Sequence, residues 1–308
     1  MKPDCRIWAV TAYFNPCAYK SRRENYRLFR ERLNIPLLAI ELRCNDHFDL
    51  SDDDADIVVR VAEGSSLWQK ERLLNVAVNH LPSDVEYIVF VDCDIIFERS
   101  DWADELQRVL EHFPVVQCYS ELVDLPKDHN SSEKMPNSIS GYSVAWLAQS
   151  GELDGPLKSD TARRRSSAGG AWAVRRDLIK KHNLYDVMVL GGADRLFAYA
   201  CLGKFEEAIT LARLGPRRAQ HYLDWAKPLH QTVCGNIGVI EGRIYHLWHG
   251  TVSDRRYIER HEALENAGFD PDQHIALGTS GAWEWTSAAP ASLRRLAQDH
   301  FQARNEDS

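Results

Sequence analysis

Short apolar runs alternate with amphipathic segments along the first third of the chain. The run from Ile7 to Thr11 is followed by Tyr13-Phe14-Asn15-Pro16, as expected for a buried strand that ends in a loop. Ser21–Leu33 and Leu67–Leu81 instead carry apolar residues at helical spacing, and the second segment stops before Pro82. The pattern predicts strands at residues 7–11, 36–41, 56–61 and 87–91, and helices at residues 21–33 and 67–81.

The alternation of strands and helices predicts an α/β fold, in which a mainly parallel, twisted sheet carries helices on both faces. Ligands of such sheets bind beyond the carboxyl ends of the strands. Residues 124–170 are rich in Ser, Asp, Lys, Pro and Gly and predict a long loop region. We expect one main domain at residues 1–255 and a helical extension at 256–308 packed on it, with Gln302–Ser308 frayed.

The amino-acid composition argues against several classes of protein. The 308 residues are 44% hydrophobic, which is enough for a sizeable core, and the net charge of −8 argues against a polyanion as the main partner. No apolar run approaches the roughly 20 residues that a membrane span needs, and the first residues do not resemble a signal peptide. Seven cysteines without a CxxC pair fit a reducing compartment, so we expect a cytoplasmic protein.

Two carboxylates follow the most apolar strand, Tyr87–Val91. Asp92 and Asp94 would both lie at the open end of the sheet, where they repel each other unless a cation intervenes. Mn²⁺ or Mg²⁺ commonly bridges such carboxylates to the phosphates of a substrate, as in the binding of a nucleotide diphosphate. The alternative is that the two aspartates cap a turn.

Two histidines end another apolar stretch, Val239–Tyr245. His246 or His249 offers an imidazole that would complete the coordination shell of a metal held by the aspartates, although both histidines lie far along the chain from them. Strand alternation would place the two rings on opposite faces, so that only one of them ligates unless a turn intervenes, and His249, beside Gly250, is the better candidate. A purely structural role for either ring remains open.

Two double-glycine segments carry further candidates. Gly191-Gly192-Ala193-Asp194 predicts a tight turn that presents Asp194 at a helix start, either as an N-cap or as a general base for an acceptor hydroxyl. Gly169-Gly170-Ala171-Trp172 allows close backbone approach to a ligand beside an indole, although such pairs are often only turns next to core residues. Arg163–Arg165 is either a phosphate-binding loop or a solvated run of charges.

Together these segments resemble the catalytic core of the β-1,4-galactosyltransferase-type enzymes of the GT-A fold, including their order along the chain. The resemblance covers about residues 60–255. One departure is Ala193, which stands where that family has an acidic residue, and the tryptophan-rich lead into the turn is missing. The segments that carry the resemblance are Leu67–Val76, Tyr87–Phe97, Gly169-Gly170, Gly191–Asp194 and His246–His249.

The resemblance implies a Rossmann-like sheet, a nucleotide-sugar donor and bound Mn²⁺ or Mg²⁺. It makes Asp94 and His249 metal ligands with His246 auxiliary, and Asp194 the base of an inverting displacement. The nucleotide-sugar contacts that it implies are Thr11, Ala12 and Tyr13 at the first strand end, Lys70 or Arg72, Asp92, Gly170, Trp172, Gly191 and Gly192.

We therefore predict a metal-dependent, inverting glycosyltransferase that uses a nucleotide-diphosphate sugar, most simply a UDP-sugar. The acceptor hydroxyl belongs to a glycan, lipid, protein, small molecule or modified nucleic-acid base. One alternative is a nucleotidyltransferase acting on a sugar phosphate, which would usually show a Gly-rich basic loop after the first strand. A second is a sugar-binding module that kept the fold without catalysis.

Overall fold

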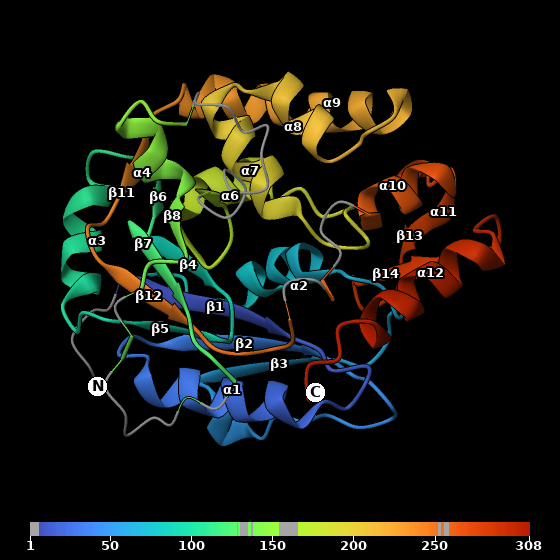
Figure 1. Ribbon diagram of the computed structural model, residues 1–308, viewed down its shortest axis with the longest axis horizontal. Helices are drawn as coiled ribbons and strands as arrows, with labels where there is room; N and C mark the ends of the chain where they lie inside the picture. Colours follow the sequence, from blue (N-terminus) through green and yellow to red (C-terminus); the bar gives the residue numbers. More distant parts are fainter. Residues whose placement is uncertain are drawn as a thin grey trace.

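A seven-stranded sheet lies at the centre of the computed structural model, which describes residues 6–127, 129, 135–136, 138–153, 166–251, 254–255 and 259–308 (Figure 1). The strand order is β11-β6-β10-β4-β1-β2-β3. All neighbours are parallel except β10, which runs antiparallel to both β4 and β6. The strands are β1 (Ile7–Tyr13), β2 (Leu37–Leu42), β3 (Ile57–Val61), β4 (Tyr87–Val91), β6 (Val115–Gln117), β10 (Ala171–Arg175) and β11 (Ile237–Val239).

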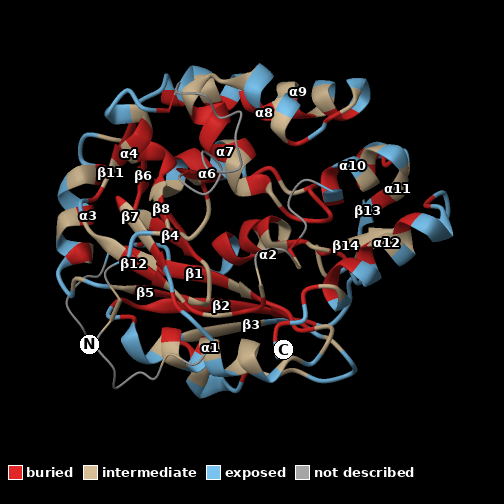
Figure 2. Cartoon of the chain, in the orientation of Figure 1, coloured by how far each residue is buried: buried red, intermediate tan, exposed pale blue. Residues whose placement is uncertain are grey.

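Helices cover both faces of this sheet, as predicted. In β4, Ile88 and Phe90 pack into one core, whereas Val89 and Val91 pack into the other, because side chains alternate along a strand. Figure 2 shows that the central strands are buried, while the outer helices keep exposed faces. The first core is covered by α2 (Lys70–Ala77), α6 (Arg176–His182) and α7 (Ala193–Leu202), and the second by α1 (Lys20–Arg32) and α3 (Trp102–Leu110).

The predicted first four strands and the helix at 21–33 are confirmed, but α2 begins later than predicted. It starts at Lys70 and passes into the 3₁₀ turn η2 (Val78–His80). The preceding Trp68 and Gln69 are held outside the helix by remote partners. The Trp68 amide donates to the Val189 carbonyl at 3.0 Å, and the Gln69 side-chain oxygen accepts from the Trp283 amide at 2.8 Å.

A second, five-stranded sheet lies beside the first and was not predicted. Part of it falls in the region 124–170, where we expected a long loop, and α4 (Val144–Gln149) lies there too. These strands have two to four residues each, too few for a clear alternation of apolar and polar positions. The strand order is β5 (Ile95–Phe97), β12 (Arg243–His246), β7 (Glu121–Asp124), β8 (Gly141–Ser143) and β9 (Ser166–Ser167).

The remaining helices extend the α2 side of the sheet and the C-terminal part of the chain. The helices predicted after Asp254 are present, but the hairpin between two of them was not predicted. The elements are α8 (Phe205–Leu211), α9 (Pro216–Val233), α10 (Glu259–Asn266), α11 (Pro271–His274), the hairpin strands β13 (Ile275–Leu277) and β14 (Trp283–Trp285), and α12 (Ala291–Gln302).

The residues after α12 are not frayed, which corrects the prediction for Gln302–Ser308. The chain returns from α12 to α1, where Glu306 is only 1% exposed and pairs with Arg22 (Figure 1). The Asp307 carboxylate accepts hydrogen bonds from the backbone amides of Lys20 and Ser21, at 3.0 and 2.9 Å. It thus caps the start of α1, whose own N-cap residue offers no side-chain acceptor.

Six cysteines lie within the described residues, and their thiols are free. None of the described helices is both long and apolar enough to cross a membrane.

The different burial of two leucines predicts that they contribute unequally to the free energy of unfolding. Leu106 in α3 is 0% exposed, whereas Leu277 in β13 is 56% exposed. Leu106→Ala should lower the free energy of unfolding by about 2–5 kcal/mol because it leaves a cavity under the main sheet. Leu277→Ala should change it by less than about 0.5 kcal/mol. Urea denaturation of both variants measures the difference, and equal losses would contradict the described packing.

Candidate functional site

The Asp92-Cys93-Asp94 segment lies at the junction of the two sheets. It leaves β4 on one side, where the Asp92 amide donates to the Gly170 carbonyl at 2.9 Å. On the other side β5 begins at Ile95 and pairs antiparallel with β12, so that Ile95 lies opposite His246. The Leu247 amide donates to the Asp94 carbonyl at 2.8 Å. Strand pairing therefore brings the histidine segment to the aspartates from far along the chain.

Asp94, His246 and His249 converge on one point. The Asp94 Oδ2 atom lies 3.3 Å from His249 Nε2 and 3.8 Å from His246 Nε2, and the two Nε2 atoms are 2.9 Å apart. One ligand atom of each residue lies within 4.8 Å of the others. The three side chains thus have the spacing of a metal site.

The two imidazoles do not point to opposite faces, because a turn intervenes between them. Alternation holds only within a strand, and β12 ends at His246. The chain then turns, and Gly250 adopts a φ of +91° that favours glycine. Both rings consequently face Asp94.

The electrostatics of this cluster fit a cation. The Asp94 Oδ1 atom is buried and has no hydrogen-bond partner among the described residues, which leaves one carboxylate oxygen without a donor. Burial raises the pKa of Asp94, an effect that His246 opposes and Asp92 increases. Burial also lowers the pKa of His249 well below its usual value, with Arg255 adding to the shift, so this ring is neutral and able to ligate.

The type of donor atom distinguishes the two expected metals. One carboxylate and two imidazoles suit Mn²⁺ better than Mg²⁺, because Mg²⁺ strongly prefers oxygen ligands. The residues therefore fit a divalent transition metal.

Asp124 orients His246 and was missed in the sequence. Its Oδ1 atom lies 2.8 Å from His246 Nδ1, because β7 and β12 are parallel with Asp124 opposite His246. Burial would raise the pKa of Asp124, but the hydrogen bond and the charge of His246, together with Arg255 and Ser140, outweigh it, and the pKa is lowered. Such a carboxylate on the outer nitrogen is common behind metal-binding histidines. Only the strand register, not the local sequence, could have revealed this pair.

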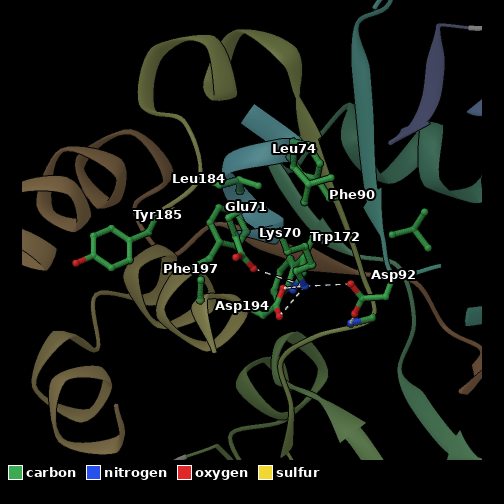
Figure 3. Close-up of a pocket in the computed structure, with 13 residues that line it drawn as sticks. Lys70, Glu71, Leu74, Phe90, Asp92, Trp172, Leu184, Tyr185, Asp194 and Phe197 are labelled. Atoms are coloured by element: carbon green, nitrogen blue, oxygen red, sulfur yellow. Dashed lines mark hydrogen bonds and ion pairs between the residues drawn. The ribbon is translucent and has the colours of Figure 1, made fainter. Parts of the chain in front are cut away.

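A second cluster surrounds the Lys70 ammonium (Figure 3). The Lys70 Nζ atom lies 2.9 Å from both oxygens of Asp194, 3.0 Å from Asp92 Oδ1 and 3.6 Å from Glu71 Oε1. Burial alone would lower the pKa of Lys70, but Asp194, Asp92 and Glu71 raise it well above its usual value. The Lys70 side chain therefore stays protonated and positively charged among three acidic side chains.

Asp194 does not cap its own helix. The N-cap of α7 is Gly192, and the Asp194 carboxylate points to Lys70 instead. Its side chain keeps 30% of its surface exposed. Burial raises the pKa of Asp194, Lys70 opposes the shift, and Asp92 adds to it. Asp194 is therefore a carboxylate that a ligand can reach.

Glycines line both carboxylates. The Gly170 amide donates to Asp92 Oδ2 at 3.2 Å, and a Cβ added to Gly169 would lie 3.6 Å from Asp194 Oδ2. At the other double glycine, Gly192 has a φ of +98°, and a Cβ there would lie 2.8 Å from His261 Cε1. Gly191 packs against Trp68 in the same way. These glycines allow the turns to pack closely around the acids.

The cavity among these residues is small. It measures about 30 Å³, enough for a few water molecules at most, and is lined by Lys70, Asp92, Gly170, Trp172 and Asp194 among others. Lys70 fills the space between the two carboxylates.

Several predicted residues lie apart from the two clusters. Arg72 points away from Lys70 and donates to Asp186 Oδ2 at 3.1 Å. Trp172 is 4% exposed, and its indole nitrogen donates to the Ala168 carbonyl at 2.7 Å, so it is mainly a core residue. Arg163–Arg165 lies outside the described residues.

The predicted nucleotide contacts at the end of β1 are mostly buried. Thr11 and Tyr13 are each 1% exposed, and the Tyr13 hydroxyl donates to Asp49 Oδ2 at 2.8 Å. Ala12, between them, is partly exposed. The side chains of Thr11 and Tyr13 therefore pack in the protein interior at the end of β1.

No protein-family model matches the chain, and no curated protein matches its sequence. Among solved structures, it is similar to glucosyl-3-phosphoglycerate synthase from Mycobacterium tuberculosis in complex with Mn²⁺, UDP and glucosyl-3-phosphoglycerate. That match has 14% identity and a TM-score of 0.40, and covers 88% of this chain and 82% of the other. It is also similar to residues 1–349 of S. aureus TarS in complex with UDP, with 13% identity, a TM-score of 0.38, and 87% and 68% coverage. Because both TM-scores are this low, the functional proposal below rests on the site geometry.

Glu71 predicts a pH dependence of stability. It is 5% exposed, and burial raises its pKa to about 8, although Lys70 opposes the shift. Because the folded state binds this proton more tightly than the unfolded state, Glu71 stabilises the fold at low pH, and that contribution is lost as the pH rises toward 8. Glu71→Gln stays neutral at every pH. The difference between its melting temperature and that of the parent should therefore shift in favour of the variant as the pH rises from 5 to 8.5.

The exposed Glu111 offers a matched control, since Glu111→Gln should follow the parent across the same pH series. A difference between Glu71→Gln and the parent that stays constant with pH would show that Glu71 does not titrate in this range.

Proposed function

We propose that this chain is a metal-dependent glycosyltransferase that inverts the anomeric centre of a nucleotide-diphosphate sugar, most simply a UDP-sugar. One observation carries the proposal: Asp94, His246 and His249 meet at the carboxyl end of the central strand β4, two residues from Asp92 in the Lys70 cluster. A cation site and a reachable carboxylate base thus lie side by side at the sheet edge where α/β proteins bind ligands.

The metal centre is assigned to Asp94, His246 and His249, with Mn²⁺ preferred over Mg²⁺. When bound, the cation would neutralise the charge that develops on the leaving diphosphate. Asp124 fixes the orientation of the His246 ring through its 2.8 Å hydrogen bond. In this proposal His246 is a ligand in its own right rather than an auxiliary residue.

Asp194 is assigned as the general base that takes the proton of the acceptor hydroxyl. It is partly exposed, and its location at the start of α7 fixes its backbone. Lys70 keeps Asp194 ionised in the ligand-free protein, and its ammonium must leave that carboxylate before Asp194 can accept a proton. Lys70 is then free to contact the phosphates or the sugar.

Donor binding is assigned to the residues around Asp92. The Gly170 amide holds Asp92 in place, which suits a carboxylate that accepts hydrogen bonds from sugar hydroxyls. Lys70, rather than Arg72, is the cation available to the nucleotide. At the end of β1, contact with the nucleotide falls to Ala12 and the backbone. Gly191 and Gly192 turn the chain just before Asp194, and Trp172, a core residue, lines the same cavity as Asp194.

The finer resemblance to β-1,4-galactosyltransferase-type enzymes stays a prediction, together with the choice of donor sugar. The acceptor is a hydroxyl compound. The released product distinguishes the proposed reaction from nucleotidyl transfer. Sugar transfer releases a nucleoside diphosphate, whereas nucleotidyl transfer to a sugar phosphate releases pyrophosphate.

Asp94→Asn should abolish the metal-dependent turnover, because it weakens the carboxylate ligand of the cation. The measurement is release of nucleoside diphosphate from a panel of UDP-, GDP- and dTDP-sugars, with and without Mn²⁺. Asp84→Asn, at an exposed position, is the matched control and should behave like the parent. If Asp94→Asn turns over a donor as well as the parent in Mn²⁺, the proposed metal centre is wrong.

Asp194→Asn should lower kcat for transfer about 10²–10⁴-fold, the usual range for loss of a general base. Mn²⁺ affinity should remain near that of the parent, because Asp194 is not among the proposed ligands. Transfer kinetics and a Mn²⁺ titration on the same preparation separate the two effects. A variant that keeps full transfer activity would remove Asp194 from the mechanism.

A further inference from the structure

Two aromatic side chains stack on each other at the start of α4. The rings of Tyr142, in β8, and Trp146, in the first turn of α4, have centroids 4.8 Å apart and planes inclined by 20°. The N-cap of the helix fixes this geometry, because the Ser143 hydroxyl accepts from the Trp146 amide at 3.1 Å. Both aromatic residues keep part of their surface exposed. The pair thus presents ring surface at a fixed position.

The polar atoms of this aromatic pair are accessible. Within the part of the chain that the structure describes, neither the Tyr142 hydroxyl nor the Trp146 indole nitrogen has a hydrogen-bond partner, and neither atom is buried. A phenol or an indole that serves only as a core residue usually has such a partner. The pair therefore combines apolar ring surface with two available hydrogen-bonding groups.

Strand β9 connects the pair with the proposed general base. Tyr142 lies opposite Ser166 in the parallel pairing of β8 with β9. The Ser166 carbonyl accepts from Arg195 Nη2 at 3.1 Å, and Arg195 directly follows Asp194 in α7. Three residues after Ser166, a Cβ on Gly169 would lie 3.6 Å from Asp194 Oδ2. Three residues of extended chain span at most about 11 Å, so the pair lies within reach of a ligand that touches Asp194.

The buried side chain of Gln117 joins these two parts of the molecule. It is 0% exposed, and its oxygen accepts from the Ala145 amide of α4 at 3.0 Å. Its nitrogen donates to the Ser167 carbonyl of β9, also at 3.0 Å. A buried polar side chain that is satisfied on both sides holds its neighbours in one arrangement. The aromatic pair is therefore held in a defined position relative to the segment that leads to Asp194.

A sugar ring is the ligand whose chemistry fits this surface. The C–H groups on one face of a pyranose pack on an aromatic ring, whose face is electron-rich, while the hydroxyls extend from the edge of the sugar. Those hydroxyls can bind the Tyr142 hydroxyl and the Trp146 N–H group. An acyl chain would cover the same rings and leave both groups without a partner, which is unfavourable. Binding sites for small molecules commonly combine aromatic surface with a few polar groups in this way.

We propose that Tyr142 and Trp146 form an acceptor subsite that stacks on a sugar ring, and that the acceptor is a carbohydrate. The inference rests on the proposed function, because it takes Asp194 as the base toward which the reacting hydroxyl points. It adds to that function the class of the acceptor and two residues that determine specificity.

The test is binding of free saccharides to the full chain, measured by saturation-transfer NMR without donor or metal. The probes are glucose, galactose, N-acetylglucosamine, maltose and lactose, with glycerol as a hydroxyl compound that has no ring. In the parent, saturation should reach the ring C–H protons of at least one saccharide and should not reach glycerol. Trp146→Leu should weaken that binding about 3- to 10-fold, the usual effect of losing one aromatic contact, whereas Trp146→Phe should keep most of it.

Trp285→Leu is the matched control, because Trp285 is a partly exposed tryptophan in the C-terminal hairpin strand β14. It should bind the saccharides like the parent. Tyr142→Leu is a second variant of the pair, to be used where Trp146→Leu does not fold, and it should weaken binding to a similar extent. The inference is overturned if no saccharide binds to the parent, or if the variants of the pair bind like the Trp285→Leu control.

Kinetics separate this inference from the proposed function. Trp146→Leu should raise KM for the saccharide acceptor about 3- to 10-fold and act on KM rather than on kcat, because the stacked ring is not the reacting group. If the parent turns over a UDP-sugar but binds no saccharide, the inference falls and the proposed function stands. If saccharides bind at the pair but no donor is turned over, the proposed function falls and the acceptor role falls with it.

Discussion

The pairing of β5 with β12 is the constraint on which the site depends. It places Ile95 opposite His246, and Asp94 immediately precedes Ile95. The parallel pairing of β12 with β7 adds Asp124 to the same row. A slip of one residue in this register would turn His246 to the other face of the small sheet. Backbone hydrogen bonds between short strands thus place Asp94 beside His246, and the turn after β12 brings His249 to the same point.

The sequence predicts the main sheet well, because its strands are long enough to show their pattern. β1, β2 and β4 are buried on both faces and read as apolar runs, and the carboxylates after β4 follow from that position. Asp194 and its turn were found through glycines that the backbone needs at positive φ. The three separated residues of the metal cluster were found through chemistry and a family resemblance together.

What the sequence did not predict depends on long-range geometry. The small sheet consists of strands too short to show a period, so Asp124 could not be connected with His246. Arg304 and Glu306 lie in a polar segment that resembles a frayed end, and only the ion pairs of Glu306 with Arg304 and with Arg22 of α1 show that the segment is held in place. Helix spacing already implies that Lys70 and Arg72 cannot both face the acids, because residues two apart point to nearly opposite sides, and the structure places Lys70 there.

The place of Lys70 between Asp92 and Asp194 also bears on selectivity. In the proposed function, a ligand that displaces the Lys70 ammonium must offer hydroxyl or other donor groups to Asp92 and Asp194, because a half-buried acid left without a partner is costly. A hexose with its full set of hydroxyls meets that demand. Under the proposed function, a deoxygenated analogue would leave one carboxylate oxygen without a donor and would therefore bind less well.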